Sequence, residues 1–354
     1  MSERFRCRYY RPSDRQGLQT LFRAVYGDEA ERKTSAWRYL DNPPEEALII
    51  VAEADGRIVG AQPSHVIRIE CHGSDVRGLL LLDVMTHPDF RGRGVFAAVV
   101  ETLREDAYAH GLRILLTTPN EAAARGFRHL DQWRCLGELS PLLLPIEPGA
   151  ILSRRRPIQS ALRSLSRLPF LTGRHLLAHQ VPAHIEHDAT QFASPNDMLW
   201  RRFRGTSPCI LVRDDRFIRW RYSQKPRRYR LYSLADGAGS TALAVTAPGR
   251  LLGRDLLLLV DLMIPHDSSA MLENLLAAVY RDAESLGVAA IMTYLSPGSP
   301  LMGPLRASGF WIIPSILRPR PYTVWGAGDT GNDQGRALLD FGAWHMMMAD
   351  SDLA

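Results

Sequence analysis

The sequence has few cysteines, and they follow no pattern. Its 354 residues hold four, at Cys7, Cys71, Cys135 and Cys209, with no CxxC pair and no cysteine–histidine cluster. Disulfide scaffolds and zinc sites both require closer or patterned spacing. We therefore expect reduced, mostly structural thiols and no metal site.

Long apolar runs are also missing. The longest, such as residues 256–260, are far shorter than the ~18 residues that a membrane span needs. The N-terminal stretch MSERFRCRYY has no apolar core of a signal peptide. These features predict a cytoplasmic protein without a membrane span.

Acidic residues are absent between Glu147 and Glu186, and residues 151–180 hold six arginines. Removing these six charges from the net charge of +5 leaves −1, so the basicity is local. Apolar residues within 158–168 follow a helical stripe with arginines opposite, the pattern of a basic amphipathic helix. Such a helix packs on its own protein as an interdomain connector or touches an anionic membrane surface. No aromatic residues interleave with these arginines, so we expect no nucleic-acid partner.

What the sequence does contain is a glycine-rich turn between an expected strand and an expected helix. Residues 83–96 read DVMTHPDFRGRGVF and lead into a helical pattern of apolar residues. The first turn of a helix presents unpaired backbone N–H groups and the positive end of the helix dipole. Glycines 92 and 94 let a ligand approach the backbone, and the arginines at 91 and 93 add positive charge. The stretch therefore predicts a site for an anionic phosphate, although glycine also occurs in such turns for steric reasons alone.

This stretch resembles the coenzyme A diphosphate loop of the GCN5-related N-acetyltransferase (GNAT) superfamily. Arg91-x-x-Gly94, preceded by the residues HPDF at 87–90, is similar to the usual Arg/Gln-x-x-Gly-x-Gly/Ala pattern. Phe96 stands where that pattern has a small residue, a departure that some members share. The resemblance extends over about residues 4–140 and implies acetyl-CoA or another acyl-CoA as co-substrate, without a metal.

The resemblance also implies roles for individual residues. Val84 and Met85 would offer backbone groups to the pantetheine arm, where two strands splay apart, and Asn120 would contact the arm near its start. Asn120 is also an ordinary helix cap, and the two roles are compatible. The residues implied to hold the diphosphate are Arg91, Gly92, Arg93, Gly94, Val95 and Phe96.

The first half predicts an α/β (mixed α+β) fold. A helix begins after Ser13 or Asp14 and ends at Gly27, and strands at 47–54, 57–69 and 76–85 are joined by tight turns. After the loop helix, residues 113–118 read as a parallel strand, followed by a helix from 121 to about 130 and a last strand that begins at 132. We expect a mixed, mostly antiparallel sheet flanked by helices.

An internal repeat predicts a second copy of this fold. Residues 37–39 (WRY) recur at 220–222, and LDVM at 82–85 recurs as VDLM at 260–263. At the position of the RGRG turn the second half has SAML at 269–272, so we expect one cofactor site per chain. The expected domains are 1–147 with the acyl-CoA site, 148–185 as a basic helical linker, 186–325 as a degenerate GNAT-like domain, and a tail at 326–354.

Two segments of the second half allow alternative interpretations. The aromatic and arginine residues near Trp220 build a core edge with surface pairs, or else an active site. In the tail, Trp344, Asp350 and Asp352 either belong to a packing-only or frayed terminus or line a pocket for a cationic amine.

Catalysis is less well specified than binding. Asp83 is a candidate general base, but Asp261 repeats it in a half that lacks the phosphate loop, which favours a structural role for both. The tyrosine that the resemblance implies as general acid is absent, because Arg128 stands at its position, with His129 beside it. We expect an N-acyltransferase that acts on a small amine, or alternatively a non-catalytic coenzyme A-binding module.

Overall fold

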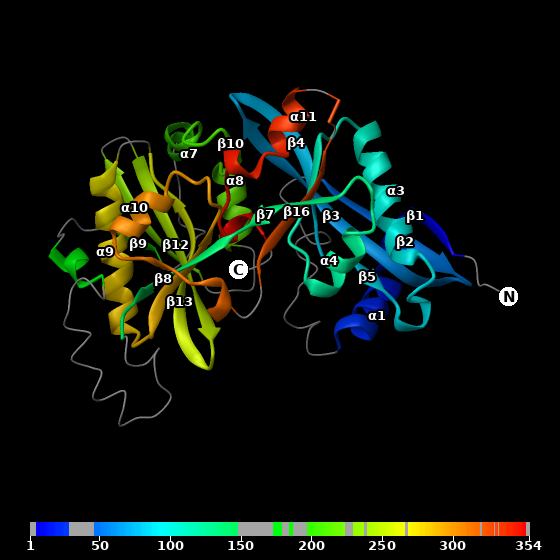
Figure 1. Ribbon diagram of the computed structural model, residues 1–354, viewed down its shortest axis with the longest axis horizontal. Coiled ribbons are helices and arrows are strands. Elements are labelled where there is room, and N and C mark those ends of the chain that lie inside the picture. The colour runs from blue at the N-terminus through cyan, green and yellow to red at the C-terminus, as the bar shows by residue number, and fades with distance from the viewer. Residues whose placement is uncertain are drawn as a thin grey trace. The chain divides into compact units, whose positions relative to one another are not determined.

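The structure is a computed structural model that divides into two compact units (Figure 1). Unit 1 comprises residues 1–137 and 323–340, and unit 2 comprises residues 138–322 and 341–354. The described residues are 5–27, 46–147, 173–178, 184–186, 197–223, 229–236, 239–265, 268–318, 321–328, 330–331 and 333–351. The element predicted at 37–39 lies outside them, as does most of the basic segment 151–180, from which the structure describes the 3-10 helix η5 (Arg174–Ala178).

Unit 1 contains a mixed sheet in the order β1-β2-β3-β4-β6-β16-β7. β2, β3 and β4 form the predicted antiparallel meander, joined by turns at Gly56 and Gly73, which both have positive φ. β4 and β6 run parallel, as predicted. The strands are β1 (Arg6–Tyr9), β2 (Ala47–Ala54), β3 (Arg57–Cys71), β4 (Ser74–Leu81), β5 (Met85–Thr86), β6 (Ile114–Thr117), β7 (Arg134–Glu138) and β16 (Thr323–Gly328).

The helices of unit 1 bury the apolar stripes that the sequence predicts. α1 (Arg15–Tyr26) buries Leu18, Leu21 and Phe22, and α3 (Val95–Ala109) buries one face against the sheet. α4 (Glu121–Phe127) ends three residues before its predicted end. The remaining helical elements are η1 (Pro12–Asp14), η3 (Pro88–Phe90) and α11 (Asp333–Leu338).

Unit 2 has a sheet with the corresponding spatial arrangement of strands, in the order β15-β8-β14-β13-β12-β11-β9. Its parallel pair, β13 with β14, corresponds to β4 with β6. The strands are β8 (Ser140–Pro145), β9 (His184–Glu186), β11 (Arg230–Asp236), β12 (Gly239–Leu251), β13 (Arg254–Met263), β14 (Ala290–Leu295) and β15 (Trp311–Ile312). β10 (Cys209–Leu211) and β17 (Trp344–His345) pair with each other. The helices are α7 (Met198–Phe203), α8 (Asp215–Ile218), the π-helix η8 (Arg219–Ser223), α9 (Ser269–Ser285), α10 (Met302–Ala307), η9 (Ser315–Leu317), η10 (Phe341–Ala343) and η11 (Met348–Asp350).

The predicted domain boundaries assign two strands, β8 and β16, differently from the structure. β8, expected in the first domain, pairs antiparallel with β14, and its Leu142 and Leu144 are fully buried in the core of unit 2. β16, placed across the predicted boundary at 325, pairs with β6 and buries Trp325 and Ala327 in the core of unit 1. The predicted division at 147 and the separate tail at 326–354 are therefore corrected, because strand pairing and apolar burial place these strands.

The segment near Trp220 is a core edge, as predicted, because Trp220, Arg221 and Tyr222 are buried. Exposed Arg219 also forms a surface ion pair with Asp215 at 3.9 Å. Arg213 is fully buried and donates from Nε to both carboxylate oxygens of Asp261 at 3.1 Å. The Tyr222 hydroxyl donates to the same carboxylate at 2.7 Å. The other side of the Arg213 guanidinium pairs with Asp350 at 2.5 Å. The cluster fixes Asp261 in a structural ion pair.

The end of the described chain is packed into unit 2 and is not frayed. Residues 344–351 are all buried, and Trp344 and His345 have no exposed surface. Arg221 donates hydrogen bonds to the carbonyl oxygens of Ala349 and Ser351. These contacts confirm the packing interpretation of this segment. Asp352 lies outside the described residues.

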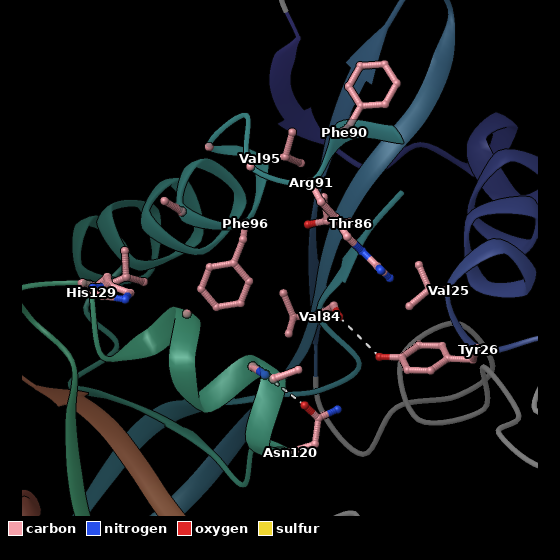
Figure 2. A pocket seen from close by; sticks show the side chains of 17 residues that line it. Val25, Tyr26, Val84, Thr86, Phe90, Arg91, Val95, Phe96, Asn120 and His129 are labelled. Atoms are coloured by element: carbon pink, nitrogen blue, oxygen red, sulfur yellow. Dashed lines mark hydrogen bonds between the residues drawn. The ribbon is translucent and has the colours of Figure 1, made fainter. Parts of the chain in front are cut away.

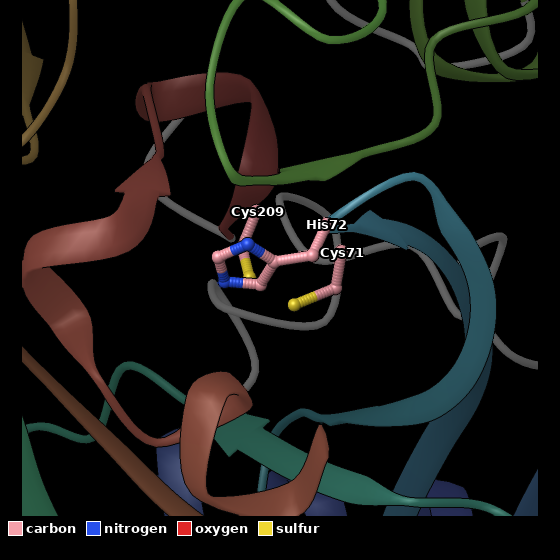
Figure 3. A group of neighbouring side chains, drawn as sticks. All are labelled: Cys71, His72 and Cys209. Carbon is pink, nitrogen blue, oxygen red and sulfur yellow. The ribbon is translucent and has the colours of Figure 1, made fainter. Parts of the chain in front are cut away.

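The cysteines differ from the prediction in part. Cys7 and Cys135 are free thiols, whereas Cys71 and Cys209 are oxidised to disulfide. Cys71 is the last residue of β3, and His72 begins the turn that follows it (Figure 3). Among the described helices, none combines the length and the apolar character that a membrane span requires.

Candidate functional site

Unit 1 contains a cavity of about 620 Å³ beside the glycine-rich turn (Figure 2). Its walls come from the turn and the start of α3, the strand segment at Val84 and Thr86, the end of α1 and one side of α4. The charged or titratable side chains in the lining are Tyr26, Arg91 and His129. The cavity is therefore largely apolar, with a positive charge at the turn.

The turn has the backbone that its glycines permit. Gly92 and Gly94 have φ of +74° and +81°, in the left-handed region that side chains with a Cβ rarely adopt. Gly94 is the N-cap of α3, and its carbonyl oxygen accepts a hydrogen bond from the Ala98 N–H at 3.0 Å. The N–H groups of the first helical turn have no carbonyl acceptor within the helix, and Val95, Phe96 and Ala97 of this turn line the cavity.

The two arginines of the turn differ in placement. Arg91 lines the cavity, and its guanidinium points toward Val25 and Tyr26 (Figure 2). Arg93 instead lies over the ring of Phe90, 5.0 Å from the centroid. Phe90 is buried beneath the turn in η3, so the cation–π contact helps to hold the turn on the core.

A β-bulge opens the strand that leads to the turn. β3 pairs with β4 at Ser64–Leu81 and with β5 at Ala61–Met85. Between these pairs, the three residues 82–84 face the two residues 62–63 of β3, which makes the bulge. Asp83 is in this bulge with φ of +42°. Gln62 is fully buried, and its side-chain amide donates to the carbonyl oxygens of Pro63 at 2.7 Å and Leu82 at 3.0 Å. The Pro63 carbonyl oxygen also accepts from the Leu82 N–H at 3.0 Å. Gln62 therefore adds a side-chain donor to backbone carbonyl groups on both sides of the bulge.

Beyond the bulge the strand diverges from its parallel neighbour. β4 and β6 pair at Leu79–Leu115 and Leu80–Leu116, whereas β5 pairs only with β3 in the described sheet. α4 begins on the far side of the opening. Its N-cap, Asn120, accepts a hydrogen bond at Oδ1 from the Ala123 N–H at 2.9 Å and also lines the cavity (Figure 2). The expected cap is confirmed, and the same side chain stands beside the cavity.

Phe96 is accommodated by a glycine on α4. A Cβ added at Gly126 would lie 2.6 Å from the Phe96 ring, closer than real atoms approach. The ring also packs edge-on against Phe127, with centroids 5.2 Å apart. Gly126 and Phe96 together shape the middle of the cavity. This explains how the site tolerates an aromatic residue at a position where the family pattern has a small one.

The structure brings most of the predicted site residues to one place. The predicted residues that line the cavity are Val84, Arg91, Gly92, Gly94, Val95, Phe96 and Asn120. Met85 is fully buried in the core, Arg93 lies on Phe90, and Asp83 does not line the cavity.

Sequence reasoning missed the contribution of α1 to the cavity. Val25 and Tyr26 line it, and the Tyr26 hydroxyl donates to the Val84 carbonyl oxygen at 3.3 Å. Val25 follows Leu18, Leu21 and Phe22 in a helical pattern of apolar residues. Only the folded sheet places the last turn of α1 beside the bulge. His129, the neighbour of the absent general acid, lines the cavity and is exposed.

Comparisons with known proteins agree with this geometry. The family described as "Acetyltransferase (GNAT) domain" matches residues 6–129, which include strands β1 to β6, the turn and α4 of unit 1. Residues 6–129 therefore form a GNAT domain. No curated protein sequence matches it.

Solved structures of two GCN5-related N-acetyltransferases and a probable N-acyltransferase share the fold over most of the chain. A GCN5-related N-acetyltransferase from Anabaena variabilis has 12% identity and a TM-score of 0.58, and a probable N-acyltransferase from Enterococcus faecalis has 12% identity and a TM-score of 0.60. In both, the alignment covers 91% of this chain and 72% of the other. A GCN5-related N-acetyltransferase from Kribbella flavida has 14% identity and a TM-score of 0.55, over 91% of this chain and 70% of the other. The mixed sheets of this chain thus confirm the predicted fold class.

The equivalent region of unit 2 is built differently from the expected alignment. The residues SAML at 269–272 form the first turn of α9, so they do not replace the RGRG turn position by position. Nine residues, 86–94, separate Met85 from α3, but only five, 264–268, separate Met263 from α9. Unit 2 therefore has a shorter connection with neither arginine nor glycine.

Proposed function

We propose that this GNAT protein is an N-acyltransferase that moves an acetyl or other acyl group from acyl-CoA to an amine of a small molecule. The observation that carries the proposal is the Gly92–Gly94 turn, whose positive-φ glycines and helix N-terminus open on the apolar cavity of unit 1. The corresponding connection in unit 2, residues 264–268, has no glycine, so one cofactor is bound per chain.

In this proposal the cofactor follows the cavity from the turn to the bulge. The backbone amides of residues 92–96 and the Arg91 guanidinium bind the diphosphate through charge-assisted hydrogen bonds. Val84 and Met85 offer backbone groups to the pantetheine arm, and Asn120 contacts the arm from α4. The volume of about 620 Å³ is within the range of small-molecule sites.

The reaction requires a neutral amine, stabilisation of the oxyanion and a proton for the leaving thiolate. The thioester carbon gains a bond to the amine nitrogen and loses its bond to sulfur, and the amine releases one proton as the thiolate takes one up. The Tyr26 hydroxyl reaches the bulge at the Val84 carbonyl oxygen, and we assign it the proton to the thiolate. Asp83 does not line the cavity, so no proton transfer is assigned to it. Holding the two reactants together supplies a further part of the rate.

Release of the free thiol from acetyl-CoA, measured with a panel of small amines, tests the proposal. We expect amine-dependent release at least about ten times above the rate without amine. Arg91→Ala should weaken cofactor affinity about tenfold or more, because a charged hydrogen-bond donor is lost. The matched control is Arg77→Ala, which removes an exposed charge from β4. Cofactor binding without turnover for any amine would instead identify a non-catalytic coenzyme A-binding module.

A further inference from the structure

Unit 2 has a second cavity, of about 410 Å³. Its walls come from the end of β13, the first turn of α9, the start of α10 and the region after α7. In Figure 1, α9 and α10 lie beside the sheet of unit 2. None of the ten lining residues carries a charge.

The two cavities occupy equivalent positions in the two sheets. α3 and α9 bury the same helical pattern, with Val99 and Val100 of α3 matched by Leu275 and Leu276 of α9. α4 and α10 match at their buried Phe127 and Leu305. When the two units are aligned in this way, six equivalent positions line the cavity in both units. The pairs are Thr86 with Ile264, Gly92 with Ser268, Phe96 with Leu272, Ala122 with Pro300, Ala123 with Leu301, and Gly126 with Pro304.

The substitutions between the pairs change the chemistry of the cavity. Ala122, Ala123 and Gly126 become Pro300, Leu301 and Pro304, which add apolar surface and fit the smaller volume. The positive charge of Arg91 has no counterpart in the lining of the second cavity. The second cavity has neither a glycine turn nor a cation in its lining that could bind an anionic diphosphate. Transfer of the charged diphosphate from water into this cavity would therefore carry a large desolvation free energy.

Polar groups in the second cavity are few. Ser268 and Ser269 lie at the start of α9, and Thr206 lies opposite them in the lining. The Thr206 hydroxyl oxygen is buried and has no hydrogen-bond partner among the described residues. A buried hydroxyl normally has a partner, so this one points to a ligand oxygen. Water would fill the remaining apolar space poorly, because each molecule needs two to four polar partners.

We propose that unit 2 binds an uncharged, mainly aliphatic small molecule that carries one hydroxyl or carbonyl oxygen. Its apolar body lies against Ile264, Leu272 and Leu301, and its oxygen pairs with the Thr206 hydroxyl. This site is separate from the cofactor site proposed for unit 1 and does not depend on it.

Methyl NMR on the full chain with 1-hexanol as the probe tests this proposal. We expect saturable shifts of the methyl groups of Ile264, Leu272 and Leu301, and at least about tenfold weaker binding of the hexanoate anion. Thr206→Val keeps the shape of the side chain and removes its hydroxyl, so it should weaken hexanol binding about fivefold.

Two further variants test which of the two cavities binds hexanol. Ser269→Trp fills the second cavity from an exposed helical position and should abolish hexanol binding. Ala97→Trp, the matched control, fills the cavity of unit 1 from α3 and should leave hexanol binding unchanged. Thermal melts check that both variants are folded. Equal affinity for hexanoate, or loss of hexanol binding in Ala97→Trp, would overturn the proposal.

Discussion

The side-chain amide of Gln62 donates a hydrogen bond to the backbone carbonyl oxygen of Leu82 across the β-bulge, at 3.0 Å. The same amide reaches the Pro63 carbonyl oxygen, so one buried side chain holds both edges of the bulge. The bulge precedes Val84, whose backbone the proposed cofactor contacts. Gln62 does not line the cavity, and its influence on binding passes through the shape of this backbone.

Gln62→Leu should therefore weaken coenzyme A binding about tenfold, because the Leu82 carbonyl oxygen loses its side-chain donor, the Pro63 carbonyl oxygen keeps only the Leu82 N–H, and the bulge shifts. Binding of the nucleotide fragment that keeps the diphosphate but lacks the pantetheine arm should stay within about twofold. Calorimetric titration of both ligands measures the difference. The control is Ser64→Ala, two residues along the same strand, which removes a hydrogen bond to the Leu48 carbonyl oxygen and leaves the bulge intact. Parallel losses for both ligands would argue for general destabilisation.

Gly94→Asp should abolish measurable coenzyme A binding. The φ of +81° strains any residue with a Cβ, and the added carboxylate would repel the diphosphate at the helix N-terminus. Gly73→Asp is the matched control, since Gly73 has φ of +77° in a hairpin turn away from the cavity. Both variants carry the same strain and charge change, so unfolding midpoints should fall together while affinity falls in one alone. Retained affinity in Gly94→Asp would refute the diphosphate site.

Gly126→Ala should raise KM for acyl-CoA severalfold. The new methyl group would meet the Phe96 ring at 2.6 Å and push it into the cavity. The double variant Gly126→Ala with Phe96→Leu should recover the original KM, because the smaller side chain makes room for the methyl group. Steady-state kinetics of the two single variants and the double variant form a cycle. Additive effects on KM would show that the two residues do not share the space.

Tyr26→Phe should lower kcat by roughly 100-fold and leave KM for acyl-CoA unchanged, if the hydroxyl delivers the proton to the thiolate. Loss of the 3.3 Å hydrogen bond to Val84 by itself would act mainly on binding. An acyl-CoA with a more acidic thiol as leaving group needs less protonation and should restore part of the rate. Unchanged kcat in Tyr26→Phe would remove this role from the hydroxyl.

His345 should make the stability of unit 2 fall in acid. Burial, with a further contribution from the charge of Arg213, holds the pKa of His345 well below its usual 6.5. The unfolded chain gains a proton below pH 6.5 while the folded chain stays neutral, so stability is lost as pH decreases, by up to about 1.4 kcal/mol per pH unit. Burial raises the pKa of Asp350 to about 6, which acts in the opposite direction between about pH 4 and 6.

A comparison with His345→Gln isolates the histidine, because Asp350 is unchanged in the variant. Urea unfolding at about pH 7.5 and about pH 5.5 should show the parent losing about 1 kcal/mol more than the variant. The glutamine side chain introduced at this position is expected to keep a hydrogen bond to the Ser299 hydroxyl, which lies 2.7 Å from His345 Nδ1. Equal losses in the two proteins would mean that the pKa of His345 is not lowered in the folded state.

Local sequence was sufficient for much of unit 1. The glycine turn, the amphipathic pattern of α1 and α3 and the Asn120 cap were predicted because each depends on residues within one or two turns of chain. The prediction that this turn forms a phosphate site also depended only on residues within the turn and the start of the helix. The end of α4 was predicted three residues too late, because this helix lacks a strong stop signal such as the glycine that ends α1.

Charge pairing was not predictable from sequence spacing. Asp261 was recognised as a repeat of Asp83, but its partner Arg213 is 48 residues away in sequence and became evident only in the folded unit. The buried position of Trp344 to Ser351 depends on the same cluster through Asp350. Without the tertiary structure these side chains looked like surface groups, because arginine and aspartate are mostly exposed unless they are paired.

By itself the sequence determined most helices and strands between residues 13 and 137, the glycine turn and the resemblance to the GNAT superfamily. Only the tertiary structure decided that β8 pairs in unit 2 and β16 in unit 1, that Tyr26 stands at the bulge, and that unit 2 retains a cavity. The reason is physical: propensities, caps and turns act over a few residues, whereas sheet neighbours and cavity walls are set by which apolar faces are buried together.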